Sequence, residues 1–472
     1  MENLNSANEV NRRQALGVIG ASAVAMQTNR VGIGTGEAFA QEGRGNDPSD
    51  LEVLPPRNRI PLSFIIDDST CLVNMGHFCM PQFAAAWPER EVYRQPWKDW
   101  PREIPDRFVR EFGEWCAEYS VKGKYSIVPY PACVGWVDRF IPGWSKRELD
   151  DSLALVRDLM VPNWDIHPEM ISHTRVVDLK TGRPMDEATS ATMENSFPQT
   201  DISTDYLAEY LAYALRVLKN CDLLCEGITT PGGFGNRVKD KLPIAVHQAV
   251  RDVYGTELPH YFKYVRGEQE STVPTLEYID DSNTVDRLTI NVPAGTGDWF
   301  GGWEGTQQSD PDRYCDEDAT GGRMVEMIKR GEPAVMLCHW PGMYCNGSKT
   351  GFKAFQRVVR SLKARYEDQT LWMKCSEIGR YYAVKALVRV SRVNETTIEI
   401  DSPLACDDFT LKLSTKGTIV PSNVKSEHGQ VDLKNVRNPP QLSAGTYVRN
   451  GDESHVCFQL ASGKSRLELA LA

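Results

Sequence analysis

Short apolar runs alternate with amphipathic stretches between residues 60 and 384. The run from Leu62 to Ile66 is apolar at every position except Ser63, which is typical of a strand buried on both faces. Between such runs, apolar residues recur at helical spacing, as they do over 105–120. This alternation of strands and helices predicts a parallel α/β fold.

The pattern contains seven or eight strands, which favours a parallel (β/α)7-8 barrel over an open sheet. The expected strands cover 62–68, 124–129, a run ending near 167, 226–230, 260–265, 288–292, 333–338 and 371–374. The expected helices cover 105–120, 145–160, 201–218, 242–254, 321–330, 352–366 and 377–382. A long loop is expected from Cys71 to Arg102, and its aromatic residues can either stack on sugar rings or pack on one another.

From about Val384 the chain changes to short alternating segments separated by turn residues. This change predicts a small C-terminal antiparallel β-domain. We therefore expect a β/α-barrel catalytic domain over 59–384 and a β-rich accessory domain over 385–472. A linker rich in Gly, Asp, Glu and Pro is expected before them, over 41–58.

The composition is that of a soluble globular protein with an acidic balance. The 472 residues carry a formal net charge of -11, which argues against general affinity for nucleic acid. After the first 40 residues, no apolar run reaches the length of a membrane span. The 12 cysteines are scattered without a CxxC pair, so we expect most of them to be small buried hydrophobic residues.

The N-terminal segment has the features of an export signal. Arg12-Arg13 precedes a weakly apolar stretch from Val18 to Met26, and Ala38-Phe39-Ala40 offers small residues for signal cleavage. This pattern predicts a twin-arginine-type signal peptide over 1–40 and a periplasmic or secreted protein. The alternative is a disordered tail with two chance arginines.

Polar or glycine-rich clusters follow five of the expected strands. They are Asp67-Asp68, His167 with His173, Pro231-Gly232-Gly233, Asp298-Trp299 and His339. The carboxyl ends of parallel strands meet at one face of an α/β barrel, and catalytic groups collect there. The sequence therefore predicts an active site built from these clusters.

These motifs resemble those of the NodB-like polysaccharide deacetylases, a family of the glycoside hydrolase/deacetylase barrel superfamily, over about residues 60 to 384. The matching segments are Asp67-Asp68, His173-Thr174, Asp298-Trp299 and Leu337-Cys338-His339. Two segments depart from the family pattern. Val177 stands where the family's His-Thr/Ser-x-x-His motif has its second histidine, and 230–234 lacks the arginine of the family's Arg-Pro-Pro-Tyr-Gly segment.

The resemblance implies a metal-dependent carbohydrate deacetylase-like hydrolase. It implies that Asp68 and His173 bind a divalent metal, with zinc as the expected ion, and that Asp67 is the base. His167 lies six residues before His173 and is the candidate for the remaining metal ligand.

The chemistry of deacylation asks for the same residue types. A metal held by one carboxylate and two imidazoles lowers the pKa of a bound water, and a second carboxylate takes its proton. His339 can then protonate the leaving group, with Asp298 as its orienting partner. Trp299, Trp340 and Glu169 are the expected substrate-binding residues.

Two other functions remain open from the sequence. The first is a glycoside hydrolase on the same barrel, which would use Asp67 or Asp68 together with Glu169 or Asp298. The second is a carbohydrate-binding protein that has kept the barrel without its metal. All three readings imply a carbohydrate partner, and fold alone does not choose among them.

The export signal makes a first prediction. Replacing Arg12 and Arg13 by lysine should hold the precursor in the cytoplasm, because the twin-arginine route reads the arginine pair. Fractionation of cells that express the wild type and the variant measures this. Equal export of both proteins would contradict the assignment.

Overall fold

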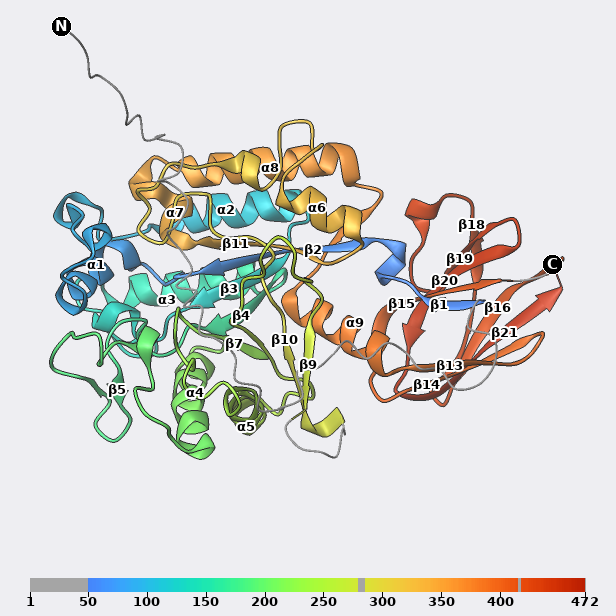
Figure 1. Cartoon of the computed structure of the whole chain (residues 1–472), viewed down its shortest axis with the longest axis horizontal. Helices are drawn as coiled ribbons and strands as arrows, with labels where there is room; N and C mark the ends of the chain where they lie inside the picture. Colours follow the sequence, from blue (N-terminus) through green and yellow to red (C-terminus); the bar gives the residue numbers. More distant parts are fainter. Residues whose placement is uncertain (1–49, 279–284, 415–416, 472) are drawn as a thin grey trace, which may run out of the picture. The chain divides into compact units, whose positions relative to one another are not determined.

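Two mostly parallel sheets form the centre of the α/β region (Figure 1). The computed structural model describes residues 50–278, 285–414 and 417–471. The expected signal peptide lies outside these residues. The first sheet has the order β11-β2-β3-β4, with β12 also paired to β2, and all its pairings are parallel. Its strands are β2 (Ile60–Asp67), β3 (Gly123–Ile127), β4 (Trp164–Pro168), β11 (Ala334–His339) and β12 (Thr370–Trp372).

The second sheet has the order β7-β8-β10-β9. Its strands are β7 (Gly227–Thr229), β8 (His260–Phe262), β9 (Thr275–Tyr278) and β10 (Leu288–Asn291). Only β9, which the sequence did not predict, runs antiparallel to its neighbour. A further pair, β5 (Val177–Asp178) with β6 (Arg183–Pro184), forms a small hairpin after β4.

The mixed α/β class with parallel strands is confirmed, whereas the described residues do not form a continuous closed barrel. The two sheets meet through single contacts in the described residues. Glu169 forms an isolated bridge with Thr229, and the Gly295 amide donates to the Val335 carbonyl at 2.8 Å. β7 forms a ladder with β8, but among the described residues no ladder joins β7 to β4.

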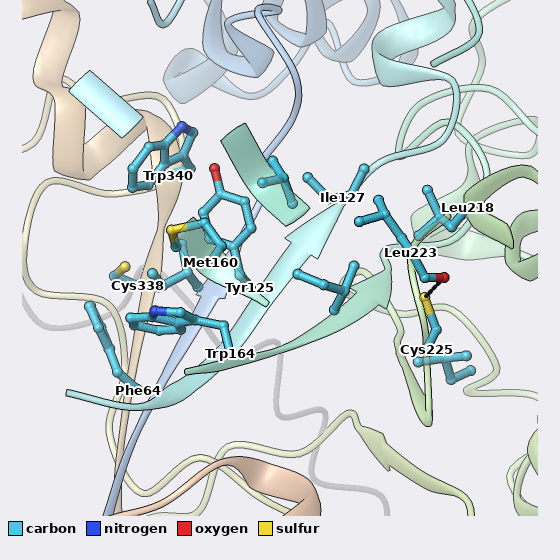
Figure 2. Close-up of a cluster of buried hydrophobic side chains, with 14 of the residues drawn as sticks. Phe64, Tyr125, Ile127, Met160, Trp164, Leu218, Leu223, Cys225, Cys338 and Trp340 are labelled. Atoms are coloured by element: carbon cyan, nitrogen blue, oxygen red, sulfur yellow. Dashed lines mark hydrogen bonds between the residues drawn. The ribbon is translucent and has the colours of Figure 1, made fainter. Parts of the chain in front are cut away.

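Side chains alternate between the two faces of the first sheet. Phe64 belongs to a cluster that includes helix side chains, whereas the next residue, Ile65, packs with Val335 and Leu337 in a second cluster. Figure 2 shows the helix-facing layer, where Phe64, Tyr125 and Trp164 lie close together. This period of two decides which polar residues point into the interior.

Helices cover the outer faces of these sheets (Figure 1). They are α1 (Met75–Ala86), α2 (Asp106–Glu118), α3 (Lys146–Leu155), α4 (Thr204–Lys219), α5 (Leu242–Tyr254), α6 (Arg323–Arg330), α7 (Trp340–Tyr344), α8 (Thr350–Tyr366) and α9 (Cys375–Leu387). Among the described residues, none of the helices is both long enough and apolar enough to cross a membrane.

The segment from Cys71 to Arg102 is not the continuous loop that the sequence predicts. It contains α1, which begins where the Asn74 side chain accepts a hydrogen bond from the Gly76 amide. The helix was missed because apolar residues occur on all of its faces and because Pro81 lies inside it. Phe83 on this helix packs against Trp87 and Tyr93, so these aromatic residues form a small cluster of their own.

The predicted antiparallel β region is confirmed and consists of two five-stranded sheets, with orders β1-β15-β20-β19-β18 and β13-β14-β21-β16-β17. Only β18 and β19 pair in parallel. The strands are β1 (Leu51–Val53), β13 (Arg389–Asn394), β14 (Thr397–Ser402), β15 (Cys406–Ser414), β16 (Ile419–Ser426), β17 (Gly429–Asp432), β18 (Lys434–Val436), β19 (Thr446–Asn450), β20 (Glu453–Leu460) and β21 (Gly463–Leu471).

Residues 51–53 correct the expected linker over 41–58. They form β1 and pair with β15, because Leu51 and Val53 can pack their side chains on the apolar cluster of the β region. The end of α9 likewise runs through the expected boundary at 384. The β region therefore uses residues from both ends of the described chain.

The α/β and β regions share one apolar cluster. It contains Ile65 and Val335 from the parallel sheet, Ile378 from α9, and Leu411 and Val456 from the β region. Removal of the β region would expose this cluster, so the two regions stabilise each other.

All twelve cysteines are free, and all but Cys133 and Cys345 are buried, as the scattered spacing predicts.

The hydroxyl of Tyr381 joins the regions and makes a second prediction. It donates to the Leu54 carbonyl at 2.8 Å and accepts from the Thr410 amide at 3.2 Å. Tyr381→Phe should lower the free energy of unfolding by about 1–3 kcal/mol, because two buried backbone groups lose their partner. Urea unfolding of the full chain measures the change.

Tyr382→Phe is the matched control, because its hydroxyl forms no hydrogen bond with the described residues. Equal stability of the two variants would contradict the role given to Tyr381.

Candidate functional site

The chain turns sharply where β2 ends. Asp67 is the last residue of β2, and Asp68 has a φ of 59°, a left-handed conformation that aspartate adopts more readily than most residues. The Asp68 amide donates to Glu169 Oε2 at 2.7 Å, which ties this turn to the end of β4. Charges on both aspartates raise the pKa of His339, so both carboxylates lie near the same region.

Asp68, Glu169 and His173 form the central cluster. His173 Nε2 lies 2.8 Å from Asp68 Oδ1 and 3.3 Å from Glu169 Oε1. Both carboxylates are buried, whereas His173 is partly exposed. Although the contact with His173 is short, Asp68 Oδ1 has no hydrogen-bond partner of suitable geometry among the described residues. The three side chains thus converge on one point and leave a buried oxygen unsatisfied.

Glu194 holds the loop that carries His173. Its carboxylate accepts hydrogen bonds from the amides of Ile171 (3.2 Å), Ser172 (2.9 Å) and His173 (2.5 Å). Burial raises the pKa of Glu194 to about 7, although the hydrogen bonds from Tyr210 and these amides oppose the shift. Nothing in the local sequence distinguishes this glutamate from a solvated one, so only the structure shows its positioning role.

Asp67 is paired with a buried lysine that sequence reasoning missed. Lys124 is fully buried and donates to Asp67 Oδ1, to Ser126 Oγ at 2.8 Å and to the Ile66 carbonyl at 3.1 Å. Burial raises the pKa of Asp67, and the charge of Lys124 opposes that shift. The available signal was the alternation in β3, where Lys124 and Ser126 share the face opposite to Tyr125.

His339 and Asp298 are in the contact that the sequence predicts. His339 Nδ1 lies 2.8 Å from Asp298 Oδ2, and the same oxygen accepts the His339 amide at 3.1 Å. Burial lowers the pKa of His339, but the hydrogen bond with Asp298 and the charges of the nearby aspartates outweigh it and raise the pKa to about 10. His339 also pairs with Asp67 across β11 and β2.

Glu304 is a second residue that the sequence analysis missed. It lies in the segment after β10 and is buried, and its Oε2 has no hydrogen-bond partner among the described residues. Its Oε1 accepts from Gln307 at 3.0 Å and from Thr306 at 3.3 Å. Burial raises the pKa of Glu304, while His339 lowers it, so this carboxyl group lies within electrostatic range of the candidate site.

His167 does not join Asp68 and His173. Its Nε2 lies 2.9 Å from His260 Nε2, and Asp165 completes this separate, fully buried group. The reason is the strand period: Asp165 and His167 alternate along β4, and Glu169, which follows the last residue of the strand, continues the alternation nearer the strand end. The sequence predicted that Glu169 binds substrate and that His167 binds the metal. The structure instead places Glu169, not His167, beside Asp68 and His173.

The two tryptophans expected to bind substrate differ in exposure. Trp340 is 0% exposed and packs against Phe108 and Phe112, so it is a core residue and cannot contact substrate here. It begins α7, and the sequence did not predict that helix. Trp299 is partly exposed, with the Arg313 guanidinium 4.1 Å from its ring centroid, and its substrate role stays a prediction.

An aromatic wall lies beside His173. The Phe83 ring centroid is 6.2 Å from that of His173 and 5.2 Å from that of Trp303. Tyr93 in turn lies 5.8 Å from Trp303. The sequence left open whether the aromatic residues pack on one another or stack on sugar rings. The rings pack on one another, and they do so next to the candidate site.

The residues present fit a divalent metal. Ligand atoms of one tetrahedral or octahedral ion at about 2.1 Å lie roughly 3 to 3.4 Å apart. The contacts of 2.8 Å and 3.3 Å around His173 Nε2 are close to this spacing. The unsatisfied oxygen of Asp68 provides a buried lone pair for such an ion.

Comparison with family models finds no match for this chain, and comparison with curated proteins finds none. Among solved structures, the chain is similar to a protein from Mycobacterium smegmatis that is provisionally named a polysaccharide deacetylase. The sequence identity is 11% and the TM-score 0.39, covering 73% of this chain and 98% of that one.

A Parabacteroides distasonis protein, provisionally named a glycoside hydrolase/deacetylase, matches with 11% identity and a TM-score of 0.37, over 84% of this chain and 91% of that one. The catalytic domain of GH30 xylanase C from Talaromyces cellulolyticus matches with 8% identity and a TM-score of 0.27, over 89% of this chain and 99% of that one. The first two names agree with the family that the sequence motifs resemble. At these TM-scores the likeness carries no argument about the site, which depends on its own geometry.

The central cluster makes a third prediction. Asp68→Ala and His173→Ala should each remove one equivalent of bound zinc per chain, because each variant deletes a ligand of a three-residue site. Elemental analysis of the purified full chain after dialysis against zinc measures the content.

Asp150→Ala and His428→Ala are the matched controls, since both residues are exposed. Wild-type zinc content in both site variants would show that these side chains do not bind the metal.

Proposed function

We propose that this chain is an exported, metal-dependent hydrolase that removes acyl groups from a poly- or oligosaccharide. The observation that carries the proposal is the convergence of Asp68, Glu169 and His173 next to two further pairs, Asp67–Lys124 and Asp298–His339. Deacylation needs an activated water, a proton acceptor and a proton donor, and these groups supply all three roles.

Asp68, Glu169 and His173 would hold the metal. A bound divalent ion, with zinc as the expected one, would polarise the acyl carbonyl and lower the pKa of a water. Glu169 also accepts the Asp68 amide, so one ligand fixes the backbone of another. This set contains two carboxylates and one imidazole, where the family motif has one carboxylate and two imidazoles.

Asp67 is the proposed base. Its neighbour Lys124 donates to Oδ1, which leaves Oδ2 as the atom that takes the proton from water. Lys124 also holds the carboxylate in place through its bonds to Ser126 and the β2 backbone. Because Lys124 is an ammonium with no exposure, its pairing with Asp67 compensates a charge in the interior.

His339 is the proposed acid. Asp298 accepts the hydrogen at Nδ1 and orients the ring, which leaves Nε2 as the atom that gives a proton to the leaving alkoxide or amine. The raised pKa of His339 keeps the ring protonated at neutral pH, as this role requires. Asp298 acts through His339 and is a positioning residue.

The aromatic wall supports a carbohydrate substrate. Buried Phe83 lies beside His173 and packs against Trp303, which is partly exposed, and partly exposed rings of this kind bind the apolar face of a sugar. Trp299 follows the same strand end as Asp298 and can contribute to this surface. The expected location for an enzyme acting on such polymers is the periplasm or the outside of the cell.

A glycoside hydrolase is the second candidate, and Glu304 is the observation that favours it. This buried carboxyl group has a raised pKa, which suits a general acid, and one unsatisfied oxygen. Asp67 and Asp298, by contrast, are each paired with a neighbouring basic side chain, Lys124 and His339.

A fourth prediction separates these candidates. The wild type should release acetate from acetylated chitooligosaccharide or acetylated xylooligosaccharide, lose activity with a chelator and regain it with zinc. Asp67→Asn should reduce turnover by about 100-fold or more while metal content stays normal, because the variant keeps the shape but not the proton acceptor. Acetate release and elemental analysis measure the two quantities.

Asp150→Asn controls for the loss of one surface charge. Release of reducing ends without acetate, abolished by Glu304→Gln and insensitive to chelation, would overturn the deacetylase proposal in favour of the glycoside hydrolase.

A further inference from the structure

A second polar group lies deeper in the α/β region than the candidate active site. Asp165 and His167 come from β4 and His260 from β8, and all three are fully buried. His167 Nε2 lies 2.9 Å from His260 Nε2, and Asp165 Oδ2 lies 3.8 Å from the same His260 atom. The proposed deacylation mechanism does not use any of these side chains.

The two Nε2 atoms that face each other are atoms through which imidazoles bind metal ions. On its other side, His167 Nδ1 lies 3.3 Å from the Thr229 hydroxyl, which can either accept a hydrogen bond from Nδ1 or donate one to it. A neutral imidazole has only one N–H. When His167 Nδ1 donates to Thr229 and His260 also carries its hydrogen on Nδ1, the two Nε2 atoms that face each other both carry lone pairs. A cation between them removes this repulsion.

Asp165 is placed as a metal-binding carboxylate is. Ser376 donates to both of its oxygens, from the amide to Oδ2 at 2.7 Å and from the hydroxyl to Oδ1 at 2.7 Å. Within the described residues, no lysine or arginine forms an ion pair with Asp165. Hydrogen bonds that orient the ligands, and backbone carbonyls that accept from ligating histidines, are general features of metal sites.

Gly227 allows the two rings to meet. It belongs to β7, which lies between β4 and β8, and a Cβ added there would be 2.7 Å from His167 Nε2 and 2.8 Å from His260 Nε2. Any larger residue would therefore push the rings apart. The absence of a side chain at Gly227 thus leaves room for the two imidazole rings.

We propose that Asp165, His167 and His260 form a second, buried site for a divalent metal, with zinc as the best fit to two imidazoles and one carboxylate. The ion would join β4 to β7 and β8, where the described residues show an isolated bridge between Glu169 and Thr229 and a contact of His167 with the Thr229 hydroxyl. Its role is to stabilise the fold. The site is independent of the proposed hydrolase function.

Metal stoichiometry tests the second site without an activity measurement. The full chain, produced with Zn²⁺ in the medium and dialysed, should contain two zinc ions per chain. The double variant Asp68→Ala/His173→Ala should keep one, because it leaves the buried group intact. His260→Gln in the same background should keep none and should lower the Tm. Elemental analysis and thermal unfolding measure both effects.

His247→Gln is the matched control, since His247 is also buried but bonds a backbone carbonyl and belongs to neither group. A folded double variant without zinc would overturn the second site whatever the fate of the hydrolase proposal. If His260→Gln does not fold, the double variant alone decides, because its content of one ion or none does not depend on His260. Loss of zinc from the double variant on substitution of His247 but not of His260 would also overturn the assignment.

Discussion

The burial of charged and polar side chains between the parallel strands is the constraint on which the rest of this structure depends. Lys124 has no exposure, and its ammonium group is compensated by Asp67 at the end of the neighbouring strand. The ion pair places the carboxylate of Asp67 beside the turn at Asp68. The geometry of the candidate active site therefore begins with a charge that the interior requires to be paired.

The same constraint divides the polar residues into two layers. Asp165 and His167 occupy alternate positions of β4, and Glu169 follows directly after the carboxyl end of the strand. Glu169 reaches the turn after β2, whereas His167 meets His260 below it. Two groups of carboxylates and histidines that could each hold a metal ion thus lie in one interior; His173 of the first group is partly exposed, whereas all three residues of the second are buried.

The β region packs against the other end of the strands and stabilises them. Its apolar cluster continues into the interior through Ile65, Val335 and Leu337, and Tyr381 fixes α9 to residues on both sides. Residues 51–53, which precede β2 in the chain, belong to this region as β1. Because the two regions share a core, the position of β2, and with it that of Asp67, depends on both.

The sequence by itself determined the alternation of the main parallel strands and helices, though not β9, α1 or α7, as well as the antiparallel C-terminal region and the presence of Asp67-Asp68 and His339 at strand ends. Local periodicity decides these features, since it follows from residues a few positions apart. The contact between Asp298 and His339 was also predicted, because both follow strands whose ends meet. Only the tertiary structure decided that Glu169, not His167, lies with His173, that Lys124 pairs with Asp67, and that Trp340 is core. These outcomes depend on the depth and direction of side chains from different strands, and strand pairing between distant segments determines both.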